Sequence, residues 1–155
     1  MRQDTRLSRL LHVLLHMAET EEALTSQEIA GMLGSNAVVV RRILTGLRDG
    51  GFVAAEKGHG GGWRLTRPTE EITLLDIYRS LGEPELFAFG LSNPAPECLV
   101  EQAVNATMES TIAAADEALR TRFAETRLSD IELAFKAKRS RRGGMTHPGP
   151  DRAGD

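Results

Sequence analysis

The chain has 155 residues, one cysteine and a formal net charge of −3, and 41% of its residues are apolar, enough to form a core. Its 5% of aromatic residues argue against a protein that stacks RNA bases, and no apolar run of about 18 residues predicts a membrane span. The single cysteine and the lack of a signal-peptide pattern predict a cytoplasmic protein.

Charge is distributed unevenly along the chain. Residues 1–68 hold 9 Lys and Arg against 7 Asp and Glu, residues 69–135 hold 4 against 13, and residues 136–155 hold 6 against 2. The three net charges are therefore +2, −9 and +4. Because acidic surface repels phosphate, the middle segment is not suited to lie along DNA, whereas the first segment is.

An amphipathic helix is predicted from Asp4 to Glu19, where leucines recur at steps of three and four residues. His12 and His16 lie four residues apart on it, a spacing that can hold a metal ion. Since no third ligand lies nearby in the sequence, we interpret both as surface residues and predict no metal site.

Two short helices follow in a helix-turn-helix pattern. Thr25 and Glu28 form a capping box for the first, and Gly34 ends it where a positive φ is expected. Ser35 or Asn36 caps the second helix, which continues to Arg48 although three consecutive valines favour a strand. Its predicted outward face comprises Asn36, Ala37, Arg41, Thr45 and Arg48, with Val38 and Arg42 beside it. In helix-turn-helix proteins this second helix enters the major groove.

A glycine run, Gly58–Gly62, lies between two short apolar segments that are predicted strands. It lacks the Lys-Ser/Thr of a phosphate loop, and no Gly-x-Ser-x-Gly elbow accompanies it as an oxyanion motif would require. We interpret it as the tip of a hairpin whose backbone amides approach phosphates, with Lys57, His59 and Arg64 supplying charge.

The second half of the chain is predicted to connect and pair subunits. A capped helix, Thr73–Leu81, is followed by a loop rich in proline and glycine, and then by a helix from Glu97 to Glu125. The long helix has one apolar seam, which suits pairing with the same helix of a second subunit.

A last short helix that contains Ile131, Leu133 and Phe135 is predicted to be capped by Ser129. After it, a basic tail rich in glycine and charge is predicted to be disordered.

Several of these segments resemble the Rrf-two (Rrf2) family of bacterial transcription regulators. The resemblance rests on Leu24–Ala30, Ser35–Leu44, Leu47–Val53, Gly58–Leu65 and Ile72–Ile77. It implies a mostly α fold: a winged helix-turn-helix with a small β-hairpin wing and a long C-terminal dimerisation helix. It also implies a homodimer on operator DNA, with the second helix of the pair in the major groove and the wing at the minor groove.

The chain departs from that family at its sensor. Cluster-binding members carry three cysteines in the loop and at the start of the long helix, whereas this chain has only Cys98. A conventional iron–sulfur cluster is therefore excluded, and no cofactor is predicted. Three interpretations of Cys98 stay open: an inert residue at a helix start, a thiol sensor activated by the helix N-terminus, or one ligand of an unusual cluster shared between subunits.

The sequence thus predicts a homodimeric, sequence-specific DNA-binding transcription regulator that acts as a repressor. The alternatives are a winged-helix protein–protein interaction module and a redox or cluster sensor that uses Cys98. An enzyme is not predicted, because no nucleophile–base pair or paired carboxylate set is recognisable.

The predicted domains are a DNA-binding domain (1–81), a connecting loop at the sensor position (82–96), dimerisation helices (97–136) and a basic tail (137–155). The predicted DNA-contacting residues are Ser26, Ser35, Asn36, Val38, Arg41, Arg42, Thr45, Arg48, Lys57, His59, Gly60, Gly61 and Arg64.

Overall fold

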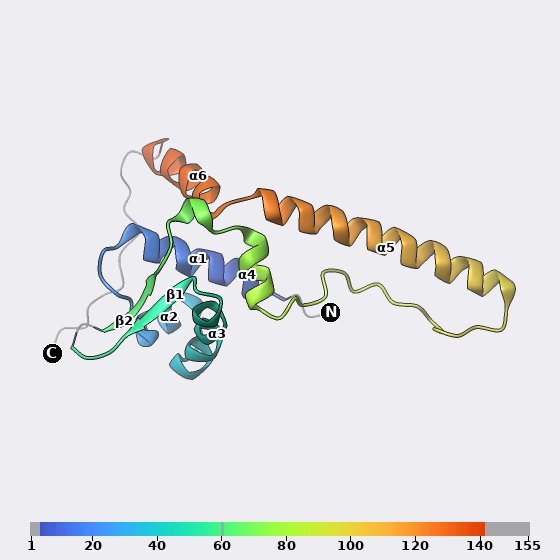
Figure 1. The fold of residues 1–155 in the computed structure, drawn as a ribbon, viewed down its shortest axis with the longest axis horizontal. Coiled ribbons are helices and arrows are strands. Elements are labelled where there is room, and N and C mark those ends of the chain that lie inside the picture. Colours follow the sequence, from blue (N-terminus) through green and yellow to red (C-terminus); the bar gives the residue numbers. More distant parts are fainter. Residues whose placement is uncertain (1–3, 60, 142–155) are drawn as a thin grey trace.

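The computed structural model describes residues 4–59 and 61–141, and it confirms the predicted mostly α architecture with a small hairpin and a long C-terminal helix (Figure 1). The elements are α1 (Arg6–Glu19), α2 (Ser26–Leu33), α3 (Ala37–Asp49), β1 (Val53–Glu56), β2 (Gly62–Leu65), the 3₁₀ turn η1 (Thr69–Glu71), α4 (Leu74–Ser80), α5 (Leu99–Glu125) and α6 (Leu128–Arg141). Within the described part of the chain, no helix is long and apolar enough to cross a membrane.

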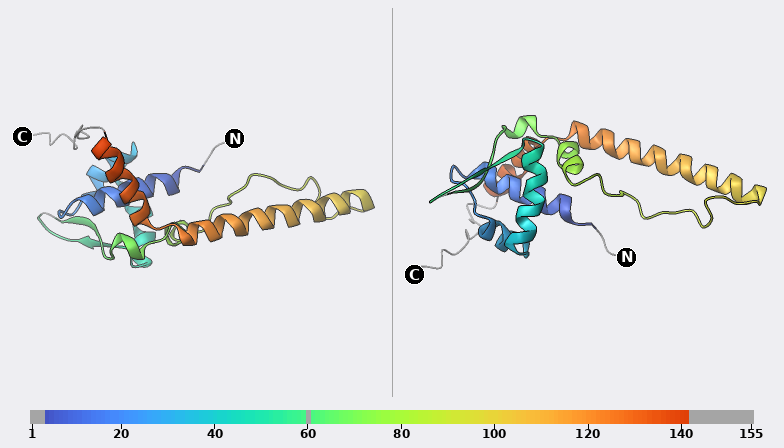
Figure 2. Two further views of the ribbon diagram at one scale, coloured as in Figure 1. Left: turned by 90° about the horizontal axis from the view of Figure 1, so that it is seen from above. Right: turned by 60° about the horizontal axis from the view of Figure 1, so that its bottom comes forward.

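The molecule consists of a packed body and one projecting helix. In Figures 1 and 2 α1–α4, the hairpin and α6 lie together, while α5 projects away from them. The segment after α4 runs outward beside α5 to its far end, where the helix begins. We call the packed part the winged body. Its core is one cluster of buried apolar side chains from α1, α2, α3, the hairpin, α4 and the start of α6.

The helix-turn-helix forms as its capping signals predict. Thr25 accepts a hydrogen bond from the backbone of Glu28, whose carboxylate accepts one from the Thr25 amide in return. Gly34 has φ +57° and ends α2, a conformation that costs glycine little. Asn36 then caps α3. Local chemistry therefore fixes where both helices begin and where the turn between them lies.

The hairpin is antiparallel, with Val53 opposite Leu65 and Glu56 opposite Gly62. The backbone at Leu24 pairs with the hairpin as well. The Leu24 amide donates to the Trp63 carbonyl at 2.9 Å, and the Trp63 amide donates to the Leu24 carbonyl at 2.7 Å. A Cβ at position 62 would lie 2.6 Å from the carbonyl oxygen of Leu24, so only glycine permits this approach. The hairpin is thereby fixed to the segment that enters α2.

The chain returns from α5 to the winged body through backbone hydrogen bonds. The amide of Leu74 donates to Thr126 (3.0 Å), and the amide of Leu128 donates to Ile72 (2.8 Å). The side chain of Leu128 is fully buried. As a result α6 packs on η1 and α1, where Thr69 donates a hydrogen bond to Glu132 (2.8 Å).

Two details predicted for the last helix are wrong. It begins at Leu128, so Ser129 lies inside the helix. The carboxylate of Asp130 accepts a hydrogen bond from the backbone amide of Arg127. Leu133 and Phe135 are 66% and 42% exposed on this helix. The helix also continues to Arg141, so the predicted start of the tail at residue 137 is too early. Residues 142–155, the rest of that tail, lie outside the described residues.

Candidate nucleic-acid interface

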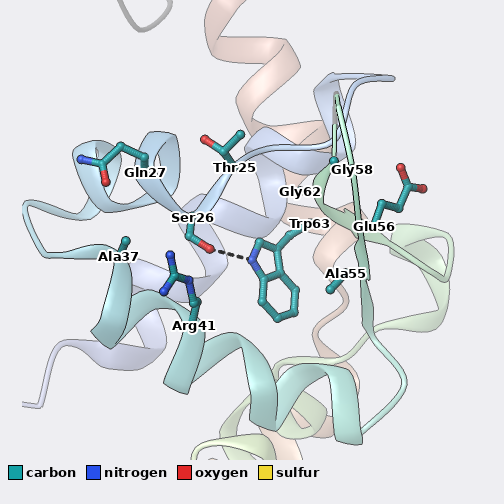
Figure 3. A pocket seen from close by; sticks show the side chains of 11 residues that line it. Thr25, Ser26, Gln27, Ala37, Arg41, Ala55, Glu56, Gly58, Gly62 and Trp63 are labelled. Carbon is teal, nitrogen blue, oxygen red and sulfur yellow. Dashed lines mark hydrogen bonds between the residues drawn. The ribbon is translucent and has the colours of Figure 1, made fainter.

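The start of α2, the start of α3 and the hairpin enclose a cleft of about 420 Å³ (Figure 3). Trp63 forms its inner wall, and its indole Nε1 donates a hydrogen bond to the Ser26 hydroxyl at 3.0 Å. Arg41 projects into the same space from α3. The structure therefore brings three separate predicted features together: the first turn of α2, the outward face of α3 and the glycine-rich hairpin.

The outward face of α3 carries two arginines and an apolar side chain. Arg41 and Arg42 are exposed, and among the described residues neither guanidinium group has a hydrogen-bond or ion-pair partner. Val38 is 71% exposed on the first turn of the same helix. An exposed valine beside two unpaired guanidinium groups has no evident role in packing within the subunit.

Other predicted residues of α3 are already hydrogen-bonded within the protein. The side-chain oxygen of Asn36 accepts from the amides of Val38 and Val39, at 3.1 and 3.0 Å. A bidentate contact to adenine would require that same oxygen. The hydroxyl of Thr45 donates to the backbone of α3, and Arg48 pairs with Asp49 at 3.1 Å. Ser35 is exposed in the turn before the helix.

Two predicted contact residues of the hairpin, Gly61 and Arg64, already form bonds within the protein. The amide of Gly61 closes the turn by donating to Gly58 at 3.0 Å, so this amide is used before any phosphate approaches. Arg64 bonds the carbonyl of Glu21 and pairs with Glu56 (2.7 Å), so a phosphate contact would have to replace internal bonds. Lys57 and His59 are exposed near the tip. Gly60 lies outside the described residues.

Gln27 is a cleft residue that the sequence did not identify. It is exposed on the first turn of α2 and lines the cleft next to Ser26 (Figure 3). A usable signal was present, because the capping box places positions 26 and 27 at a helix N-terminus, where anions are favoured.

His12 and His16 contact each other, with 3.0 Å between their Nε2 atoms. In the described residues, no group of three or more His, Cys, Asp or Glu side chains is arranged to hold a metal ion. The two histidines therefore form a side-chain contact on the surface of α1.

Cys98 is exposed and lies immediately before α5. The backbone N–H groups of Glu101 and Val100 lower the pKa of its thiol, because they stabilise the thiolate. The structure thus gives Cys98 two properties of a reactive thiol, namely access and a favoured anion.

We expect Cys98 to react with iodoacetamide at lower pH than a free thiol does. Because the thiolate is the nucleophile, a lowered pKa moves the midpoint of the rate–pH curve below that of N-acetylcysteine. Mass spectrometry of reactions quenched across a pH series measures this midpoint. A midpoint at or above that of the reference thiol contradicts the expectation.

The sequence has recognisable relatives. The profile of the Rrf2 family, described as an iron-dependent transcriptional regulator, matches residues 3–132. The chain is 29% identical over 129 residues to a Bacillus subtilis protein that carries the name HTH-type transcriptional regulator YwnA, covering 83% of this chain and 95% of that one. It is 34% identical over 80 residues to protein aau3 of Rhizobium meliloti, covering 51% of this chain and 52% of aau3.

Solved structures with the same fold include two regulators. IscR of T. potens has a TM-score of 0.64 at 18% identity, covering 95% of this chain and 93% of that one. CymR of B. subtilis, titled the global cysteine regulator, has a TM-score of 0.61 at 23% identity, covering 86% of this chain and 98% of that one. At these identities the likeness establishes the fold.

Iron appears in the family's description, but the donor set of this chain does not fit a cluster held by one subunit. Such a cluster needs several thiolate ligands, and Cys98 is the one cysteine of the sequence. Around Cys98, too, the described residues hold no group of three metal-ligating side chains.

Proposed function

Because the chain belongs to the Rrf2 family of transcriptional regulators, a family of DNA-binding proteins and not of enzymes, we propose that it reads DNA with α3 in the major groove and the hairpin at the minor groove. The supporting observation is the exposed, unpaired pair Arg41 and Arg42 on the outward face of α3. Guanidinium groups without internal partners are free to bind base edges or phosphates.

Each exposed group matches a known DNA contact. Arginine binds guanine O6 and N7 in a bidentate manner, and an apolar side chain such as Val38 contacts the methyl group of thymine. Lys57 and His59 on the hairpin and the first turn of α2 suit phosphate contacts, which fix the orientation of the protein. We assign base reading to α3 and positioning to the hairpin and α2.

Replacing Arg41 or Arg42 by alanine tests this assignment. We expect each change to weaken binding to the promoter region of the protein's own gene by about 10- to 100-fold, since a good bidentate contact contributes about 1–3 kcal/mol. Fluorescence anisotropy at fixed salt measures the dissociation constants.

Arg122→Ala is the matched control, because it removes the same charge from an exposed position on α5. It should leave DNA affinity nearly unchanged, and all three variants should keep the circular dichroism spectrum of the wild type. If both α3 variants bind like the control, α3 does not read the DNA.

We also propose that the protein is a homodimer paired through α5. The first half of this helix exposes apolar side chains on its surface: Leu99 (79%), Val100 (73%), Val104 (53%) and Met108 (37%). Such a stripe is unfavourable in water unless another surface covers it. A second copy of the same helix supplies a matching stripe by symmetry.

We propose repression as the regulatory output. A dimer bound across a promoter blocks access to that DNA by occupancy alone, so repression needs no further contact. A reporter fused to the promoter of the protein's own gene tests this, because deleting the gene should raise reporter output. Lower output after deletion would instead indicate activation.

A further inference from the structure

A second cavity, of about 560 Å³, lies between α5 and the segment that follows α4. This volume is within the range of pockets that bind small molecules, about 300–1,000 Å³. Its walls include three aromatic rings, those of Phe87 and Phe89 from the segment and Tyr78 from α4, facing Ile112 of α5. Phe89 is 70% exposed although it belongs to this wall.

The charged groups around this cavity are strongly unbalanced. Four carboxylates line it, those of Glu83, Glu85, Glu109 and Asp116, against the single guanidinium of Arg120. Arg120 is already bonded to Glu83 and Asp116, the latter at 2.6 Å. Among the described residues, Glu85 and Glu109 have no hydrogen-bond or ion-pair partner. The cavity thus joins aromatic walls to two carboxylates that are not neutralised.

We propose that this cavity binds a small aromatic cation and that its binding is linked to DNA binding. Positive charge is favoured by Glu85 and Glu109 and by the faces of Phe87 and Phe89, which attract cations. The apolar part of such a ligand would cover Phe89. The same carboxylates would repel an anion of the same shape.

The linkage follows from the position of α4, and this part rests on the proposed DNA-reading role of α3. Tyr78 of α4 lines the cavity, lies 5.2 Å from the Arg120 guanidinium and donates a hydrogen bond to Pro84 at 2.6 Å. The same helix ends at Ser80, and a Cβ at Gly46 of α3 would lie 2.7 Å from its carbonyl oxygen. α3 and α4 are therefore in direct backbone contact, so a ligand that shifts α4 also shifts α3.

Two ions of the same shape and opposite charge test the site. Isothermal titration of the DNA-free protein with tetraphenylphosphonium and with tetraphenylborate compares them directly. We expect the cation to bind at least about 10-fold more tightly, because the unpaired carboxylates attract it and repel the anion. Equal affinities, or no binding of the cation, would overturn the proposal.

Matched variants locate the binding. Glu85→Gln with Glu109→Gln should weaken tetraphenylphosphonium binding by about 10-fold. Glu97→Gln with Glu117→Gln removes one charge from the same segment and one from α5, both outside the cavity lining, and should change affinity by less than about twofold. Equal effects of the two pairs would mean that general surface charge attracts the ion, and the site would be rejected.

The linkage is measured with the promoter DNA of the protein's own gene. Saturating tetraphenylphosphonium should change DNA affinity by about fivefold or more, and DNA should change the affinity for the ion by the same factor. The Glu85/Glu109 variant should lose this effect. Unchanged DNA affinity at saturation overturns the linkage. A protein that binds the ion and no DNA would refute the proposed function while the cavity's role stands.

Discussion

Trp63→Ala is expected to destabilise the protein by about 3–5 kcal/mol, the usual cost of truncating a buried aromatic side chain. Trp63 is 7% exposed and belongs to the core cluster. Its backbone pairs with Leu24, and its indole bonds Ser26, so the change removes packing between the hairpin and the start of α2. Urea unfolding followed by circular dichroism measures the loss, since no other tryptophan remains to report it.

Two milder variants separate packing from hydrogen bonding. Trp63→Phe keeps an aromatic ring in the wall, and Ser26→Ala keeps the ring but leaves the indole N–H without its partner. Ser26→Ala should cost about 1–3 kcal/mol, in the range for a buried donor left unsatisfied. Trp63→Phe removes the donor and keeps a ring, so it should cost less than Trp63→Ala. A Trp63→Ala variant as stable as the wild type would mean that the hairpin does not contribute to the core.

Val104→Asp combined with Met108→Asp is expected to convert the proposed dimer to a monomer. The two side chains lie on the exposed apolar stripe of α5, and two carboxylates facing two more across a symmetric interface cannot be neutralised there. DNA affinity should then fall by about 100-fold or more, because linking two binding units raises overall affinity by 10²–10⁴. Sedimentation and fluorescence anisotropy measure the two effects.

Ser110→Asp is the control for that pair. It is an exposed position on a different side of α5, since successive residues turn by about 100°. This variant should leave both the sedimentation mass of the protein and its affinity for DNA unchanged. If the double variant sediments as a dimer, another surface pairs the subunits and the stripe on α5 is covered in some other way.

Short-range signals in the sequence were enough to predict the helix-turn-helix. Thr25 with Glu28, Gly34 and Asn36 each act within a few residues, so their structural consequences follow from local chemistry. Local patterns therefore determine most of the elements in the first half of the chain.

Long-range pairings could not be predicted in this way. Arg64 donates a hydrogen bond to the backbone carbonyl of Glu21, 43 residues away in the sequence. The docking of α6 depends on the amide of Leu128 reaching Ile72. Neither partner is marked by spacing or composition.

The bonds that join Leu74 to Thr126 and Ile72 to Leu128 also bear on how the protein folds. They close a loop of about 50 residues, for which chain entropy costs about 3–4 kcal/mol. Contacts of such long range form slowly compared with those inside a helix pair. We therefore expect the fully buried Leu128 to complete the core of the winged body late. The final stability of α1 to α4 should then depend on a residue that follows the long helix.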